Sequence, residues 1–401
     1  MSEIRIITYN VNGINSYNSH IKYKYNKTLN NYFKENLKGD IICIQETKGT
    51  RQSLQKFYHL NDYVCFFSFS EGKNCNGKYG VCTFVSKKFY CNGYKSFNSA
   101  SEVNKYINRH NDDNKSNLDS ENIQKNILFD QGRVLLTKHG DFHILNVYFP
   151  YIDFEIASEE KINDTKIFYQ KVRELIDSYS KVINYEDKNI NSKDKKINSE
   201  DKNINYEDKK RKEKLIILGD FNATYSLKDS FQYYSEKLRI EKGPNPLEIV
   251  KKTFYQPYDL KYSFPSILEL KNYFYYQNNF KRKWLKQIIV EKIFIDSFRF
   301  FHKHDSNIFT CWNQTYNLRE VNKGSRIDLI LVQSDLKVFM AKSRVLTYET
   351  GSDHCPVYLD LKINDENDKN SEYLNVKGNK NLCISKNNLS SFFKLNNKSP
   401  I

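Results

Sequence analysis

Carboxylate, amide and imidazole side chains stand at the ends of four short apolar runs in this chain. They lie in the segments YNVNG at 9–13, QETK at 45–48, GDFN at 219–222 and GSDHCP at 351–356. Each segment alone is weak, because Asp or Asn at the end of a strand is ordinary turn chemistry. Together they bring hard oxygen donors and a histidine into one chain, which is the equipment of metal-assisted or general acid–base hydrolysis.

Such side chains need rigid elements to hold them, and the apolar runs predict eight strands and three helices. The strands are expected at 4–10, 40–46, 80–86, 134–138, 143–150, 215–222, 327–332 and 356–363, and the helices at 28–38, 159–183 and 282–292. This alternation predicts an α/β or α+β domain with two packed sheets. A site at the strand ends would combine a rigid backbone with open loops.

Three regions fall outside this predicted core, which otherwise spans residues 1–363. The segment 98–127 is rich in Asn, Asp and Ser and is expected to be an inserted loop. Residues 184–211 repeat a seven-residue unit with one apolar position, too few for a coiled-coil seam, so a solvated helix or a disordered insert is expected. The segment 364–401 is expected to be a disordered tail.

The composition of the chain limits the classes of function that it can have. The 401 residues are enough for one large domain or two ordinary ones, and no apolar run or leader pattern predicts a membrane span or secretion. The eight cysteines include no CxxC pair, so neither a disulfide framework nor a zinc module is expected. The net charge of +15 suits a polyanion such as nucleic acid, although the codon bias of an AT-rich genome would also produce it.

The four polar segments together resemble the exonuclease III family of apurinic/apyrimidinic endonucleases, within the endonuclease/exonuclease/phosphatase superfamily. The resemblance runs from about residue 4 to 361 and includes further blocks: GV at 80–81, GR at 132–133, NVYFP at 146–150, FTCW at 309–312 and GSRID at 324–328. The pairing of FTCW with GSRID is most similar to the AP endonuclease 2 branch. The resemblance implies an α/β fold, a four-layered sandwich of two mixed sheets flanked by helices.

The resemblance also implies catalytic roles that suit phosphodiester hydrolysis, which needs an attacking water and stabilisation of the charged phosphoryl oxygens. Asp220 is expected to activate the water, and Asn222 to orient it. His354, oriented by Asp328, and the Tyr148 hydroxyl are expected to contact the phosphate. For Asp328 taken alone, a salt bridge to Arg326 is the stronger alternative.

One divalent cation, Mg²⁺ or alternatively Mn²⁺, is expected at this site, because Mg²⁺ prefers oxygen ligands and needs only one or two carboxylates. The implied ligands and their supporting groups are Asn10, Glu46, Asp220, Asn222, Asp353 and His354.

The implied substrate is double-stranded DNA with abasic sites or damaged 3′ ends, bound by a monomer in the nucleus. Candidate DNA contacts are Lys48, Tyr316, Asn317 and Arg319. The tail segment 386–393 is similar to a motif that binds the sliding clamp PCNA, with its apolar residues Leu389, Phe392 and Phe393 on one side of a helical turn. The segment 271–301 reads either as a basic DNA-facing helix or as an amphipathic cover for the core.

Two other functions fit part of the pattern. Another phosphoesterase of the superfamily, acting on a phosphomonoester, a sphingolipid or RNA, would share the Glu and Asp-His residues but lack the pairing of FTCW with GSRID. A catalytically silent scaffold that binds DNA and the clamp would explain the charge and the tail, but not the intact set of catalytic groups.

Overall fold

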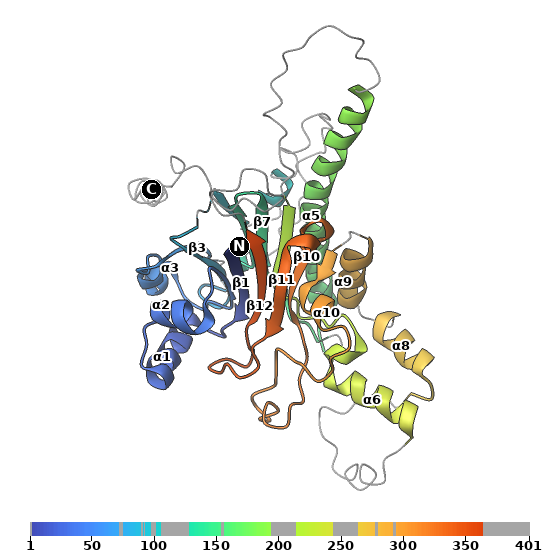
Figure 1. The fold of residues 1–401 in the computed structure, drawn as a ribbon. Coiled ribbons are helices and arrows are strands. Elements are labelled where there is room, and N and C mark those ends of the chain that lie inside the picture. The colour runs from blue at the N-terminus through green and yellow to red at the C-terminus, as the bar shows by residue number, and fades with distance from the viewer. Residues whose placement is uncertain are drawn as a thin grey trace.

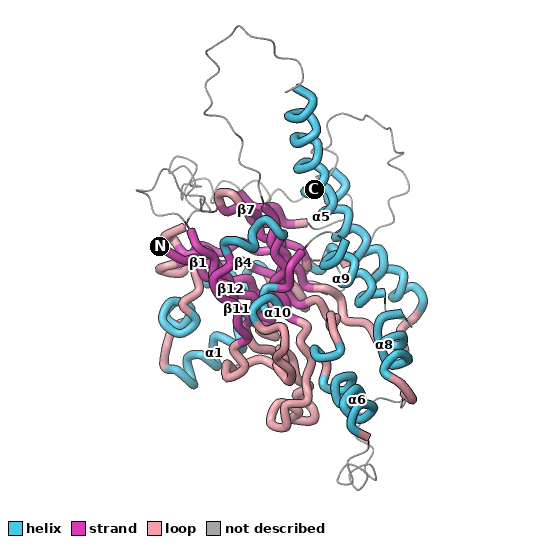
Figure 2. Tube along the Cα trace, turned by 45° about the vertical axis from the view of Figure 1, so that its right-hand side comes forward, coloured by secondary structure: helices cyan, strands magenta, loops and turns pink. Residues whose placement is uncertain are grey.

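The computed structural model describes residues 2–71, 75–89, 91, 93–97, 102–105, 128–153, 156–193, 214–243, 264–276, 280–291 and 294–363. Two six-stranded sheets form the centre of the molecule, and helices flank them on both sides (Figures 1 and 2). None of the helices within these ranges has the length and apolar character needed to cross a bilayer.

The first sheet has the strand order β11-β12-β1-β2-β4-β3. β1 and β2 run parallel, and every other neighbouring pair in this sheet is antiparallel. Its strands are β1 (Ser2–Asn10), β2 (Ile41–Gln45), β3 (Tyr63–Ser68), β4 (Val81–Ser86), β11 (Met340–Val345) and β12 (Val357–Ile363).

The second sheet repeats this plan in the order β5-β6-β7-β8-β10-β9. Its single parallel pair is β7 with β8, and the other pairs are antiparallel. The strands are β5 (Gly93–Ser96), β6 (Val134–His139), β7 (Phe142–Tyr148), β8 (Lys214–Asp220), β9 (Phe294–Asp296) and β10 (Asp328–Gln333). All eight strands expected from the sequence are therefore confirmed.

The period-2 alternation of the strands builds four layers. Ile6 of β1 and Ile144 of β7 point into one apolar cluster shared by the two sheets. Their chain neighbours point the opposite way: Ile7 packs with Tyr17 of a helix outside the first sheet, and Leu145 packs with helices outside the second. The expected four-layered sandwich is confirmed.

Helices cover the outer face of each sheet and extend beyond it. The predicted helices are present as α2 with the following π-helical turn η1 (Leu29–Tyr32, Phe33–Leu37), α5 (Glu159–Lys193) and α9 (Phe280–Glu291). The prediction omitted α1 (Ile14–Tyr25), α3 (Arg51–Leu54), α6 (Phe231–Lys242), α8 (Ile267–Tyr276) and α10 (Ser297–Phe301). The short helical turns are η2 (Gln55–Phe57), η4 (Phe129–Gln131), η5 (Leu227–Asp229) and η6 (Ser334–Phe339).

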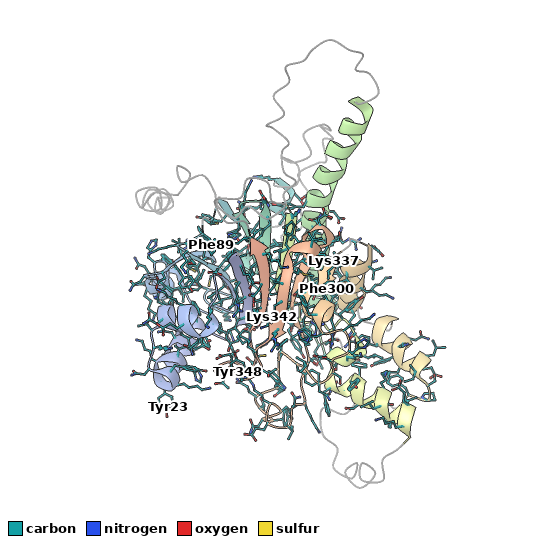
Figure 3. All side chains as sticks on the ribbon, viewed as in Figure 1. Tyr23, Phe89, Phe300, Lys337, Lys342 and Tyr348 are labelled. Atoms are coloured by element: carbon teal, nitrogen blue, oxygen red, sulfur yellow. The ribbon has the colours of Figure 1, made fainter. Side chains whose placement is uncertain are left out.

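The predicted inserts and tail lie mostly outside the described residues. α5 continues to Lys193 and so takes in the first part of the repeat at 184–211, projecting away from the sheets (Figure 1). Residues 194–211, most of 98–127 and all of 364–401 are not described. Large apolar side chains that remain exposed, such as Tyr23, Phe300 and Tyr348, come from separate elements (Figure 3).

Candidate active site

The four polar segments meet at one end of the two sheets. β1 ends at Asn10, β2 leads into Glu46, and β8 ends at Asp220, where it pairs with Asp328 at the start of β10. Because the carboxyl ends of the parallel pair β1 and β2 lie at one edge, and β7 and β8 repeat this arrangement, the two sheets present these side chains to a common opening.

An open cleft of about 570 Å³ lies over these strand ends. Acidic and polar groups line its floor, and basic and aromatic side chains line its walls. Its lining residues include Glu46, Tyr148, Tyr151, Asp220, Asn222, Phe231, Lys281, Arg282, Cys311, Lys323, Ser325, Asp353 and His354.

Asn10 connects the two sheets at the floor of the cleft. Its Nδ2 donates hydrogen bonds to Glu46 Oε1 at 2.9 Å and to Asp220 Oδ2 at 3.0 Å. The side chain is fully buried, so its amide is held in a fixed orientation. Glu46 and Asn222 have positive φ values of 53° and 46°, a backbone conformation that costs non-glycine residues energy and is often found at functional sites.

Asp220 is a buried carboxylate whose proton affinity is unusually high. The backbone N–H of Asn222 donates to its Oδ1 at 2.9 Å. Burial, and then the negative charge of Asp328, raise the pKa of Asp220 to about 7. A carboxylate with this pKa can accept a proton near neutral pH, as the expected role in activating water requires.

His354 and Asp328 form the predicted pair. The two residues lie 2.8 Å apart, between His354 Nδ1 and Asp328 Oδ2, and His354 Nε2 is 3.9 Å from Asp220 Oδ2. Burial lowers the pKa of His354, but the charge of Asp328 and its hydrogen bond outweigh burial and raise that pKa well above its usual value. The alternative salt bridge of Asp328 is not formed, because Arg326 pairs instead with Asp229 and Asp296.

Glu46 is held in its ionised form. Burial raises its pKa, but hydrogen bonds from Asn10, Lys48 and Tyr148 together lower it below the usual value. Lys48 Nζ lies 2.7 Å from Glu46 Oε2 and also donates to the Asn12 side chain, so this predicted DNA contact faces the carboxylate in the structure.

The site offers a donor set that fits a divalent cation. Ligand atoms of Asp220, Asp328 and His354 all lie within 4.8 Å of one another, and Asp328 Oδ1 is buried with no hydrogen-bond partner among the described residues. The carboxylates of Glu46 and Asp353 line the same opening, with Asn12 Nδ2 donating to Asp353 Oδ1 at 3.0 Å. Carboxylate oxygens of this kind suit Mg²⁺ or Mn²⁺. The residues could therefore bind a metal ion, with Asp328 joining the group that the sequence predicted.

Tyr148 and Asn222 lie at the cleft but are engaged with protein groups. Tyr148 is hydrogen-bonded to Glu46, burial raises its pKa, and the Arg133 guanidinium stacks over its ring at 4.4 Å. Asn222 Nδ2 donates to the Phe149 carbonyl at 2.8 Å. Arg133 was identified only within a sequence block, and its supporting contact with Tyr148 could not be read from the sequence.

Among the predicted DNA contacts, Tyr316 and Arg319 differ sharply. Tyr316 is 54% exposed. Arg319 stacks over Trp312 at 4.6 Å and donates to the backbone carbonyls of Thr347, Glu349 and Ser352. Arg319 thus ties its loop to the segment before β12.

Asn317 lies in the same loop and has a φ of 50°. The predicted clamp contacts Leu389, Phe392 and Phe393 lie outside the described residues.

Several residues of the cleft were given no individual role from the sequence, among them Lys281, Arg282 and Cys311. Cys311 was visible in the FTCW block. Lys281 and Arg282 occur in the predicted basic or amphipathic segment 271–301. The buried Trp284, Leu285 and Ile288 show that α9 covers the core, while its first turn reaches the cleft.

Fold and site together define a two-sheet α/β sandwich with a carboxylate–histidine centre at one end of the sheets. The Endonuclease/Exonuclease/phosphatase family profile matches residues 163–354. Over these residues the chain is similar to this family.

Its relatives across most of its length are AP endonuclease 2 proteins. DNA-(apurinic or apyrimidinic site) endonuclease 2 of Schizosaccharomyces pombe is 25% identical over 92% of this chain, and that of Xenopus laevis is 26% identical over 90%. The chain spans 60% of the length of each of these two relatives. The crystal structure of the Xenopus laevis APE2 catalytic domain has the same fold, with a TM-score of 0.61, 24% identity, and coverage of 97% of this chain and 98% of that one.

Proposed function

We propose that this protein is a metal-dependent DNA repair nuclease. It hydrolyses the phosphodiester on the 5′ side of abasic sites and trims 3′ ends as a 3′-5′ exonuclease and 3′-phosphodiesterase. The observation that carries the proposal is the convergence of Glu46, Asp220, Asp328 and His354 in one cleft, linked across the sheets by Asn10. The AP endonuclease 2 relatives support the choice of abasic DNA as substrate.

The chain's own residues divide the work of hydrolysis. Asp220 accepts the proton of the attacking water, which its pKa of about 7 permits near neutral pH. Protonated His354, held by Asp328, places positive charge against a phosphoryl oxygen. The Tyr148 hydroxyl donates a hydrogen bond to the same phosphate. Asn10 and Asn222 keep the Asp220 carboxylate oriented through the hydrogen bonds described above.

Mg²⁺, with Mn²⁺ as a substitute, would be held by the carboxylates at the opening, with Asn10, Asn222 and His354 supporting them. When bound, it supplies positive charge that polarises the phosphate and stabilises the departing 3′ oxygen. The lowered pKa of Glu46 favours this assignment, because an ionised carboxylate binds a cation without first losing a proton.

The proposed setting is a monomer acting on duplex DNA in the nucleus. Lys48, Tyr316 and Asn317 contact the DNA, and the tail residues Leu389, Phe392 and Phe393 bind the sliding clamp. The net charge of +15 favours a polyanionic partner.

The decisive experiment compares two labelled duplexes, one with a central abasic site and one with a recessed mismatched 3′ end. Each is incubated with Mg²⁺, with Mn²⁺ and with chelator. Metal-dependent cleavage of either duplex is expected, and the ratio of the two rates gives the balance of endonuclease to exonuclease activity. The absence of cleavage in both metals, with DNA binding retained, would replace the proposal with the silent scaffold. If neither duplex is cleaved but an RNA strand or a phosphomonoester added in parallel is hydrolysed, another phosphoesterase would be favoured.

A further inference from the structure

Lys281 is a buried amine at the edge of the reaction cleft. It is the second residue of α9, whose Trp284, Leu285 and Ile288 pack into the core outside the second sheet. Trp284 Nε1 also donates to the Tyr169 carbonyl at 2.9 Å, which fixes the first turn of the helix. Lys281 is only 6% exposed, yet it lines the same cleft as Asp220 and His354.

The surroundings of this amine lower its pKa and so raise the fraction that is neutral. Burial, followed by the positive charge of neighbouring Arg282, lowers the pKa of Lys281 to about 8, against the opposing influence of Asp220 and Asp153. The Tyr151 ring lies 5.7 Å from Nζ, and the first turn of a helix is itself unfavourable for a cation. Roughly one such amine in ten is neutral at pH 7, against fewer than one in a thousand for an ordinary lysine.

A neutral amine that lines a cleft holding an abasic sugar would meet a reactive partner. The deoxyribose at an abasic site carries an aldehyde when its ring is open, and nucleophilic lysines react with carbonyl carbons to form imines. A cleft that hydrolyses the phosphodiester beside this sugar must hold the sugar within the same opening. Hydrolysis on the 5′ side leaves the aldehyde intact on the product.

We propose that Lys281 captures the aldehyde of a ring-opened abasic sugar as a reversible imine. The lone pair of Nζ attacks C1′, the aldehyde oxygen takes a proton, and the resulting carbinolamine loses water as the C=N bond forms. No oxidant or reductant is needed, and hydrolysis of the imine regenerates the amine and the aldehyde. This inference rests on the proposed function for one point alone, that abasic DNA enters the cleft.

The test traps the imine with borohydride in the presence of chelator, so that metal-dependent hydrolysis is switched off. The full chain is mixed at pH 7.5 with a duplex that carries a natural abasic site. A duplex with a tetrahydrofuran residue, which has no aldehyde, serves as the blank. The cross-linked protein is digested and the modified lysine is located by mass spectrometry. We expect the cross-link at Lys281 in the unaltered protein, and no cross-link with the tetrahydrofuran duplex.

Matched variants separate the amine from its charge. K281M and K281R are expected to lower trapping at least tenfold, since arginine keeps the charge but cannot form the imine. K283M, on the exposed side of the same helix, is expected to trap like the unaltered protein. If K281R were trapped as efficiently as the unaltered protein, the proposal would be overturned. A cross-link found only on surface lysines would overturn it as well.

The failure of this proposal and the failure of the hydrolytic proposal give different results. Incision of abasic DNA in Mg²⁺ without a cross-link at Lys281 would overturn the imine and leave the nuclease standing. A cross-link at Lys281 without incision in either metal would support aldehyde capture and refute the nuclease.

Discussion

At the scale of single residues, the cleft combines a carboxylate whose pKa is lowered with two groups whose pKa values are raised. Glu46 has a lowered pKa because three hydrogen bonds oppose its burial, whereas Asp220 and His354 have raised values for different reasons. Burial and a neighbouring carboxylate act on Asp220, and the charge of Asp328 acts on His354. One cleft therefore holds a base and an acid at neutral pH.

Removing the base tests this division. We expect Asp220→Asn to lower the cleavage rate at least about 100-fold, because the amide cannot accept the proton of the attacking water. DNA affinity should remain within about threefold, since no DNA contact is assigned to this side chain. Initial rates and fluorescence anisotropy measure the two quantities, with the exposed Asp335→Asn as the control. Cleavage that persists in Asp220→Asn would refute the assigned base.

The same two raised pKa values predict how the stability of the metal-free protein depends on pH. Asp220 binds its proton more tightly in the folded than in the unfolded chain, so the stability it contributes is complete below about pH 4 and is lost as the pH rises to about 7. His354 continues this loss above its unfolded value of about 6.5. In chelator, the free energy of unfolding should fall between pH 5 and 8.

Urea unfolding at pH 5, 6.5 and 8 measures this dependence. Asp220→Asn should reduce the slope between pH 5 and 6.5, because an amide does not titrate. Added Mg²⁺ should stabilise the protein more at pH 8 than at pH 5, since a bound cation competes with protons. An unchanged slope in the variant would show that other groups dominate.

At the scale of secondary-structure elements, residues of the site lie at strand ends and are paired with residues of a neighbouring strand. Asn10 and Gln45 are partners in the parallel pair, and Asp220 is the partner of both Tyr148 and Asp328. Register therefore sets the geometry of the catalytic groups. The buried Arg326, paired with Asp229 and Asp296, fixes the segment that leads into β10.

The elements that could be predicted from the sequence are those with continuous apolar runs. LIILGD at β8 and IICIQ at β2 are buried throughout and bounded by polar residues, so both the strands and the site at their ends were predictable. β11, with the sequence MAKSRV, is an edge strand with a bulge and a half-exposed pattern, and it was missed. The network of Arg326 also escaped prediction, since its partners come from residues 229 and 296.

The loop from 313 to 323 allows a test of how a side chain fixes an element, because the Arg319 guanidinium donates hydrogen bonds to three backbone carbonyls. Arg319→Ala should destabilise the protein by about 1–3 kcal/mol and speed amide exchange in this loop and before β12. The salt dependence of DNA binding should not change if these bonds to carbonyls persist on DNA, because the guanidinium would then neutralise no phosphate.

Exchange mass spectrometry and binding at several salt concentrations measure these effects, with the exposed Arg344→Ala as a control for the lost charge. A reduction of about one in the salt slope of Arg319→Ala alone would instead make this residue a phosphate contact.

At the scale of the whole molecule, the proposed catalytic groups all lie within the described part of residues 2–363, and the predicted clamp motif at 386–393 lies outside the described residues. Catalysis and clamp binding should therefore be separable. Replacing Phe392 and Phe393 by alanine should lower affinity for the clamp at least tenfold, because the two rings supply most of the apolar surface of the motif. Basal cleavage of short duplexes without the clamp should not change.

Calorimetry of clamp binding and cleavage rates with and without the clamp check both statements. Leu395→Ala is the matched control, because it removes an apolar side chain just beyond the motif. If the double variant and the unaltered protein bound the clamp with equal affinity, the similarity of this segment to a clamp-binding motif would be accidental. A parallel loss of basal cleavage would mean that the tail takes part in the catalytic body, and that the two activities cannot be assigned to separate parts of the chain.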